Sequence, residues 1–266
     1  MFKAFYQFAT APFSRDIPVS RLYQTQGMKE NVERLIYTAE NNWFSILTGA
    51  PGCGKTTMLR LFVHKLSGSD YRTLYVSDSK LTPRIFYKVV LEQLGCEAKF
   101  YRCDAKRQLH REITMLQAVH RQKPVVIIDE AHLLDREMLE EVRFLLNTEM
   151  DSVSPMSLIL SGQSELRERL NMQVYTAIKQ RVNIVCQASY FDRSETGGYI
   201  RHQICEAGAQ SDIFSEAAID AIYRFTDGTA RLINKVCTHC LIYGAQNNLR
   251  IIDDHMVGRI LEGEVA

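Results

Sequence analysis

Two patterns of apolar positions divide this chain at about Tyr190. Before that point, short runs rich in β-branched residues alternate with segments long enough for crossover helices, which predicts a parallel sheet with helices on both faces. After it, only the periodicity of helices remains. The expected strands span residues 45–48, 73–77, 125–128, 157–160 and 182–186, and the expected helices span 29–41, 57–66, 82–94, 105–120, 135–147, 174–180, 195–207, 215–225, 230–247 and 253–262.

The change of pattern predicts two domains. We expect an α/β domain with a five-stranded parallel sheet over residues 1–192, followed by a small all-helical lid domain over residues 193–266. Within the second domain, Ser215 and Asp253 stand directly before helical patterns and are followed by acidic residues, which is typical of helix N-caps.

The first expected strand is followed at once by a glycine-rich turn and then by a helical pattern. The turn reads Gly49-Ala50-Pro51-Gly52-Cys53-Gly54-Lys55-Thr56, the spacing of a phosphate-binding P-loop. Its glycines let N–H groups converge on a polyphosphate, Lys55 can reach the β- and γ-phosphates, and the Thr56 hydroxyl can ligate Mg²⁺. We therefore expect ATP and Mg²⁺ as cofactors. Nucleotide contacts are expected from Gly49, Pro51, Gly52, Cys53, Gly54, Lys55, Thr56 and Thr57.

Two carboxylates follow the strongly apolar run 125–128, namely Asp129 and Glu130. Ligands of open α/β sheets bind at the carboxyl ends of the strands, so both residues should face the nucleotide. We expect Asp129 to hold the hydration shell of Mg²⁺ and Glu130 to polarise the water that attacks the γ-phosphate. Together with the P-loop, these residues predict a P-loop ATPase that converts ATP and water into ADP and phosphate.

The balance of charges favours no partner by itself, because 32 basic residues face 31 acidic ones. Any contact with nucleic acid must then come from a local patch. The window 99–111 holds five cations opposed inside it only by Asp104, and it could follow DNA phosphates or be the solvated face of a helix. Its cations are Lys99, Arg102, Lys106, Arg107 and Arg111, of which Lys99, Arg102 and Lys106 are the expected DNA contacts.

The location of the protein is predicted from its apolar runs and its cysteines. No run approaches the roughly 18 apolar residues that a membrane-spanning helix needs, so no membrane partner is expected. The seven cysteines are scattered through apparent core and helical segments, with one of them, Cys53, inside the P-loop, which suits a reducing compartment. Cys237 and Cys240 form a C-x-x-C pair inside an apolar helical pattern, which favours buried thiols over a zinc site. We therefore expect a cytoplasmic protein.

The two nucleotide motifs followed by a helical unit resemble the AAA+ ATPases, whose sheet domain carries a helical lid. Within that group, the chain is similar to the set formed by ExeA, TniB and TnsC, and the likeness covers nearly the whole chain. Three stretches carry it: Pro12-Phe13-Ser14-Arg15-Asp16-Ile17-Pro18 with Leu22-Tyr23, Leu160-Ser161-Gly162-Gln163-Ser164-Glu165-Leu166, and Ala177-Ile178-Lys179-Gln180-Arg181-Val182.

The resemblance implies roles at the matching positions of the sheet domain. Arg181 matches an arginine finger that would act in a neighbouring subunit's site, and Arg167 and Arg169 are competing candidates. Gln163 or Ser161 would be the first sensor, which reads the γ-phosphate from the end of the fourth strand.

Further roles are implied at the two ends of the chain. Arg231 would be the second sensor of the lid, although Ala230 stands where the common pattern has proline. The residues that match the segment packing near the adenine are Ile17, Leu22 and Tyr23.

The likeness to TniB and TnsC implies a regulator of DNA transposition. Such a protein binds double-stranded DNA with ATP and little sequence preference, assembles as a ring or helical filament, and recruits or activates a transposase, with a target-selection adaptor protein as a further partner. We expect slow turnover that is stimulated by oligomerisation or DNA. The alternatives are an ExeA-like ATPase of secretion assembly and a signalling NTPase that does not bind DNA.

Overall fold

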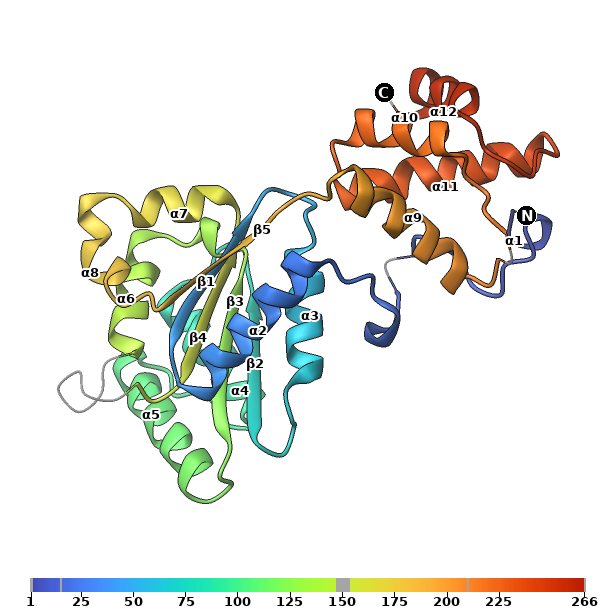
Figure 1. Cartoon of the computed structure of the whole chain (residues 1–266). Helices are drawn as coiled ribbons and strands as arrows, with labels where there is room; N and C mark the ends of the chain where they lie inside the picture. Colours follow the sequence, from blue (N-terminus) through green and yellow to red (C-terminus); the bar gives the residue numbers. More distant parts are fainter. Residues whose placement is uncertain (1, 15, 147–153, 210, 266) are drawn as a thin grey trace. The chain divides into compact units, whose positions relative to one another are not determined.

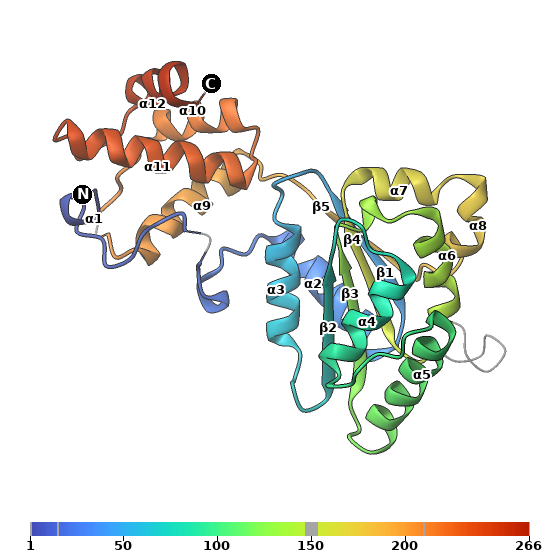
Figure 2. The same cartoon turned by 180° about the vertical axis from the view of Figure 1, so that it is seen from behind.

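The computed structural model describes residues 2–14, 16–146, 154–209 and 211–265, which form two compact units (Figures 1 and 2). The sheet unit consists of residues 27–51 and 55–188. The helical unit consists of the residues up to 26, of residues 52–54 and of the residues from 189 onward. Arg15, in the first of the three stretches above, and Asn147, the expected end of a helix, lie outside the described residues.

Five parallel strands form the sheet, as the sequence predicts. They are β1 (Phe44–Gly49), β2 (Tyr71–Ser77), β3 (Lys123–Asp129), β4 (Ser157–Gly162) and β5 (Ile184–Ala188). Their order in space is β2-β3-β4-β1-β5, so β4 lies between β1, which leads into the P-loop, and β3, which ends in Asp129. Because the strands are parallel, their carboxyl ends share one edge of the sheet.

The inner strands are buried on both faces. Val125, Val126, Ile127 and Ile128 of β3 have no exposed surface, which explains why this run is apolar at every position. Removing each such side chain from water stabilises the fold by about 1.5–3 kcal/mol. The strand end that carries Asp129 and Glu130 is therefore anchored in the core.

Helices cover both faces of the sheet (Figure 1). On one face lie α2 (Gln26–Glu40) and α3 (Lys55–Lys65). The other face shares a core with α4 (Pro83–Gln93), α5 (Arg102–Ala118), α6 (Arg136–Leu145), α7 (Ser164–Leu170) and α8 (Thr176–Lys179). Helix α7 was not predicted, because its apolar residues Leu166 and Leu170 are too few to show a helical period among charged neighbours.

The helical unit is built around a separate core. Its helices are α1 (Phe2–Phe5), α9 (Arg193–Glu206), α10 (Glu216–Thr226), α11 (Ala230–Gln246) and α12 (Asp254–Ile260). Both predicted N-caps are confirmed, since Ser215 accepts a hydrogen bond from the Ala218 N–H at 3.1 Å and Asp253 accepts one from the Met256 N–H at 2.9 Å. Cys237 and Cys240 are fully buried on α11 within this core.

The N-terminal residues pack in the helical unit, whereas the sequence placed them with the sheet in a domain of residues 1–192. Tyr6, Phe8 and Phe13 are buried in the core of the helical unit, and the Tyr6 hydroxyl donates a hydrogen bond to the Leu249 carbonyl at 2.8 Å. The dense aromatic side chains of this segment supply apolar area that short helices cannot provide alone. The local periodicity of the sequence does not show in which of the two cores the N-terminal segment packs.

Candidate active site

The P-loop joins β1 to α3 in a conformation that its glycines favour. Gly52 and Gly54 have φ angles of 82° and 92°, in the left-handed region that other residues rarely adopt. The Lys55 Nζ donates hydrogen bonds to the carbonyl oxygens of Gly49 and Ala50 at 2.8 and 3.1 Å. Helix α3 begins at Lys55, and the free N–H groups of a helix N-terminus favour an anion. The local geometry therefore suits a polyphosphate.

Asp129, at the end of β3, is 3% exposed and accepts hydrogen bonds on both carboxylate oxygens. Its Oδ2 accepts from the Thr56 Oγ1 at 3.1 Å and from the Tyr75 hydroxyl at 2.9 Å. Its Oδ1 accepts from the Ser161 Oγ at 2.7 Å and from the Glu130 N–H at 3.0 Å. These donors fix the carboxylate without neutralising it. The contact with Thr56 brings the P-loop hydroxyl and the strand-end carboxylate to one point, which is the arrangement that P-loop NTPases use to hold Mg²⁺.

Tyr75, on the edge strand β2, was missed by the sequence reasoning. Burial, followed by the charge of Asp129, raises the pKa of its phenol to about 12. It therefore remains a hydrogen-bond donor to Asp129 near neutral pH. A tyrosine on a strand is normally read as packing, and only the register of β2 against β3, which pairs Ser77 with Asp129, shows that it can reach the carboxylate.

Glu130 follows in a left-handed backbone conformation with φ of 53°. This conformation is uncommon for a residue with a side chain, and it often occurs at functional sites. The Glu130 side chain is 47% exposed, while that of the neighbouring His132 is 11% exposed. The His132 Nδ1 lies 3.5 Å from the Glu130 Oε2, and its Nε2 lies 2.9 Å from the Gln163 Nε2. No role was expected for His132 from the sequence.

The two candidates for the first sensor have different surroundings. Ser161 is fully buried on β4, and its hydroxyl is used to orient Asp129. Gln163 lies at the N-cap of α7, is partly exposed and contacts the His132 ring. Of the two, Gln163 is the residue with donor capacity left for a phosphate, because an amide carries two N–H groups.

The three candidate arginine fingers also differ. The Arg169 guanidinium donates to the carbonyl oxygens of His132 and Leu134 at 2.7 and 2.8 Å, so it is used inside its own subunit. Arg167 donates to the Gln187 Oε1 at 3.2 Å on an exposed surface. Arg181 lies in the turn before β5, is partly exposed and donates to the Ala177 carbonyl at 3.2 Å. The geometry disfavours Arg169 as a finger.

Besides P-loop residues 52–54, four of the predicted nucleotide residues lie in the helical unit. Arg231 is exposed in the first turn of α11. Leu22 is buried, Ile17 is partly exposed, and Tyr23 packs against the rings of Phe191, Tyr199 and His202. Their contacts with nucleotide stay predictions.

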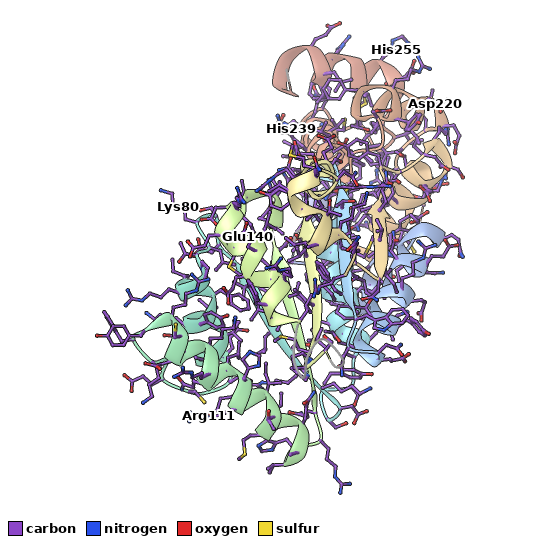
Figure 3. The ribbon with its side chains drawn as sticks, turned by 90° about the vertical axis from the view of Figure 1, so that its left-hand side faces the viewer. Lys80, Arg111, Glu140, Asp220, His239 and His255 are labelled. Atoms are coloured by element: carbon purple, nitrogen blue, oxygen red, sulfur yellow. The ribbon has the colours of Figure 1, made fainter. Side chains whose placement is uncertain are left out.

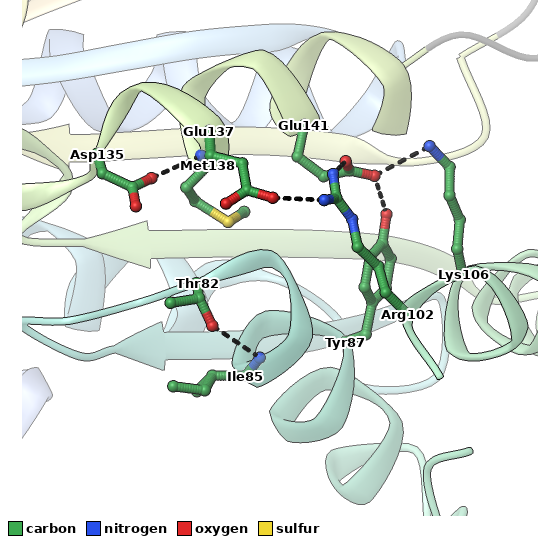
Figure 4. Close-up of polar contacts among 9 residues, drawn as sticks. All are labelled: Thr82, Ile85, Tyr87, Arg102, Lys106, Asp135, Glu137, Met138 and Glu141. Carbon is green, nitrogen blue, oxygen red and sulfur yellow. Dashed lines mark hydrogen bonds and ion pairs between the residues drawn. The ribbon is translucent and has the colours of Figure 1, made fainter. Parts of the chain in front are cut away.

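The cation window 99–111 is paired with carboxylates that the sequence reasoning overlooked (Figure 4). Arg102 forms ion pairs with Glu137 and Glu141 of α6, and Lys106 lies 2.9 Å from Glu141. Glu141 is 3% exposed and also accepts a hydrogen bond from the Tyr87 hydroxyl. Asp104 is the only acid inside the window, and the carboxylates that oppose Arg102 and Lys106 come from another helix, α6.

The remaining cations of the window are more exposed. Lys99 precedes α5, and Arg111 lies on the exposed side of that helix (Figure 3). Arg107 lies 3.6 Å from Asp104 on the same helix. Among the described residues, no helix has the length and apolar character needed to span a membrane.

Comparisons with known proteins find a family model that matches the part of the chain holding the site. Residues 39–170, which contain the P-loop, Asp129, Glu130 and Gln163, match the family described as AAA domain. These findings support an AAA+ ATPase. General secretion pathway protein A of Aeromonas hydrophila is 27% identical over 247 residues, which is 91% of this chain and 44% of that protein. The chain thus spans less than half the length of this relative.

Solved structures confirm the P-loop NTPase fold of this chain. The Aeropyrum pernix ORC1 protein in complex with DNA has a TM-score of 0.71 at 14% identity and covers 94% of this chain and 68% of its own. Drosophila ORC bound to DNA has a TM-score of 0.70 at 16% identity, with coverage of 100% and 66%. The Thermotoga maritima RuvB Holliday junction branch migration motor has a TM-score of 0.61 at 17% identity, with coverage of 92% and 73%. The narrower likeness to TniB and TnsC stays a prediction.

Proposed function

We propose that this chain binds Mg·ATP at the carboxyl edge of its sheet and hydrolyses it. The observation that supports this most strongly is the hydrogen bond between Thr56 and Asp129 at 3.1 Å, because it joins the P-loop to the end of β3. Thr56 and Asp129 would hold Mg²⁺, which supplies charge neutralisation at the phosphates when it is bound. Lys55 and the P-loop N–H groups would bind the phosphate oxygens.

In the same proposal, Glu130 polarises the attacking water and Gln163 reads the γ-phosphate. The 47% exposed side chain of Glu130 can reach a water molecule outside the strand end, whereas the buried Asp129 cannot leave its donors. Ile17, Leu22, Tyr23 and Arg231 remain proposed contacts of the nucleotide.

Two variants test this division of roles. Lys55→Ala should weaken the binding of a fluorescent ATP analogue, because it removes the cation that contacts phosphate. Glu130→Gln should retain that binding and lose hydrolysis by about a hundredfold or more, within the range of positioned general bases. Equal loss of binding in both variants, or hydrolysis retained by Glu130→Gln, would contradict the proposal.

We propose further that the active form is a homo-oligomer in which Arg181 acts on the site of a neighbouring subunit. Arg181 is partly exposed in the turn before β5 and matches the family's arginine finger, which supports this role. Inactive Arg181→Ala and inactive Lys55→Ala subunits should regain turnover when mixed, because each supplies what the other lacks. Two results together would rule this out. The mixtures would stay inactive, and the wild-type turnover per subunit would not change with protein concentration. The same experiment on Arg167→Ala separates the two candidates.

Two cellular processes are candidates for the use of ATP by this chain. The first is secretion assembly, supported by the likeness to General secretion pathway protein A over 91% of this chain. The second is ATP-dependent DNA binding in transposition, with a transposase and a target-selection adaptor as partners. It is supported by the resemblance to TniB and TnsC and by structural neighbours solved with DNA. Lys99 and Arg111 are exposed for such a contact, while Arg102 and Lys106 are paired with carboxylates.

Fluorescence anisotropy of a labelled random-sequence duplex separates the two candidates. The protein is titrated with ADP, ATP or a non-hydrolysable ATP analogue at two salt concentrations. Salt-sensitive binding that requires ATP or its analogue would favour transposition, since counterion release makes phosphate contacts depend on salt. Absence of binding with every nucleotide would favour the secretion role.

A further inference from the structure

The last residue of β4 and the segment that follows it contact the turn after Glu130 through three residues. Gln163 contacts the His132 ring, and Arg169 donates to the His132 and Leu134 carbonyl oxygens. Gly162 completes the contact, because a Cβ atom at this position would lie 2.9 Å from the His132 backbone nitrogen. The turn is therefore held through backbone atoms of His132 and Leu134, and the His132 imidazole is not needed to keep the turn in place.

The geometry of the imidazole indicates which nitrogen carries the proton. Nδ1 of His132 is buried, has no hydrogen-bond partner within the described ranges and faces the Glu130 Oε2 at 3.5 Å. An ionised carboxylate only accepts hydrogen bonds, so a proton on Nδ1 is favoured. Nε2 must then accept, and the Gln163 amide nitrogen at 2.9 Å is its donor.

We propose that His132 is a positioning residue that couples the first sensor to the catalytic glutamate. One N–H of the Gln163 amide binds the His132 Nε2, and its second N–H is left for the γ-phosphate. A γ-phosphate therefore orients the Gln163 amide, and the amide orients the His132 ring. The Nδ1–H of the ring then holds the Glu130 carboxylate toward the attacking water. A small rotation closes the 3.5 Å separation to hydrogen-bonding distance. This inference rests on the proposed ATPase function and on the role of Gln163 in it.

Three substitutions of His132 distinguish coupling from simple packing. His132→Ala should lower kcat about ten- to hundredfold with KM within about twofold, because a misplaced catalytic group costs rate and not ground-state binding. In His132→Asn, the side-chain amide nitrogen replaces Nδ1 and should restore most of kcat. In His132→Gln, the amide reaches the Nε2 position, lacks the donor beside Glu130 and should stay slow. Equal kcat in all three variants would overturn the proposal.

A double-mutant cycle tests the coupling itself. Gln163→Ala should lower kcat more in the wild type than in His132→Ala or His132→Asn, because the part of its effect that passes through the ring is already lost in those variants and only the loss of its own phosphate contact remains. Effects that multiply in the double variants would show that the two residues act independently, which contradicts the proposal. The binding of a fluorescent ATP analogue should be unchanged in the His132 variants.

The inference also has a readout that needs no hydrolysis. The ¹⁵N chemical shifts of the His132 ring in nucleotide-free protein should show a proton on Nδ1, and Gln163→Ala should change the Nε2 shift. A ring protonated on Nε2 alone would overturn the proposal. If the wild type hydrolyses no ATP but the ring shows the expected tautomer and its response to Gln163→Ala, the proposed function fails while the coupling survives. If the wild type is active and His132→Ala matches it, the coupling fails alone.

Discussion

Two buried carboxylates in the sheet unit are equally hidden from water and are held by different kinds of donor. Asp129 and Glu141 are each 3% exposed, and each accepts a hydrogen bond from a tyrosine. The other donors to Asp129 are Thr56, Ser161 and a backbone N–H, none of which carries a charge. The other donors to Glu141 are the cations Arg102 and Lys106.

The difference explains what each carboxylate can do. Uncharged donors orient Asp129 and leave its negative charge for a bound cation, as the proposed Mg²⁺ site requires. Two cations neutralise Glu141, which joins α4, α5 and α6 and has no charge left for a ligand (Figure 4). Burial raises the pKa of the Glu141 carboxyl, but hydrogen bonds from Tyr87, Arg102 and Lys106 outweigh this and hold it below its usual value.

The largest expected effect is that of Asp129→Asn on hydrolysis. The substitution keeps the size of the side chain and removes its charge, so turnover should fall about a hundredfold or more, since a bound metal supplies several kcal/mol of charge stabilisation. Steady-state phosphate release measures this. Turnover within about threefold of the wild type would show that Asp129 serves the fold alone.

The matched variant Glu141→Gln should affect stability and not turnover. It leaves Arg102 and Lys106 without a buried counter-charge, which costs about 3–5 kcal/mol for fully buried pairs and about 2–4 kcal/mol here, because both cations are partly exposed. Urea unfolding gives the change in the free energy of unfolding. A large loss of kcat in folded Glu141→Gln protein would break the comparison.

A smaller effect is expected from removing the two tyrosine hydroxyls. Tyr75→Phe deletes one of the donors to Asp129 and should lower kcat by about threefold to tenfold, equivalent to a hydrogen bond of about 1 kcal/mol. Tyr87→Phe should leave kcat unchanged and lower the free energy of unfolding by about 1–2 kcal/mol, because its partner is a buried carboxylate. A loss of kcat in Tyr87→Phe together with unchanged kcat in Tyr75→Phe would refute the contrast between the two carboxylates.

The smallest effect concerns acid. A carboxyl whose pKa is lowered by folding stabilises the native state fully above its ordinary value of 4.5, and this contribution is lost as the pH falls through the lowered value. The wild type should therefore lose more stability than Glu141→Gln between about pH 5 and pH 3 in urea titrations. Parallel pH profiles of the two proteins would contradict this assignment.

The sequence predicted the fold well because its signals are local. The run 125–128 is apolar at every position, and the P-loop lies directly after the predicted strand 45–48. The caps at Ser215 and Asp253 also depend only on their own helices.

The parts that were missed depend on contacts between segments far apart in the chain. Tyr75 reaches Asp129 from a neighbouring strand, and Gln163 meets His132 through the packing of α7. The cations Arg102 and Lys106 were read against their own helix, whereas their partners lie on α6. The periodicity of the sequence shows which face of a helix or strand is buried. It does not show which other element packs against that face.

If Asp129 keeps its charge for Mg²⁺, the gain in nucleotide affinity that Mg²⁺ provides must depend on this residue. The Kd of a fluorescent ATP analogue is measured with Mg²⁺ and with EDTA for the wild type, Asp129→Asn and Glu141→Gln. We predict that Mg²⁺ tightens binding in the wild type and in Glu141→Gln, and that this gain disappears in Asp129→Asn. A gain of the same size in Asp129→Asn would contradict the account.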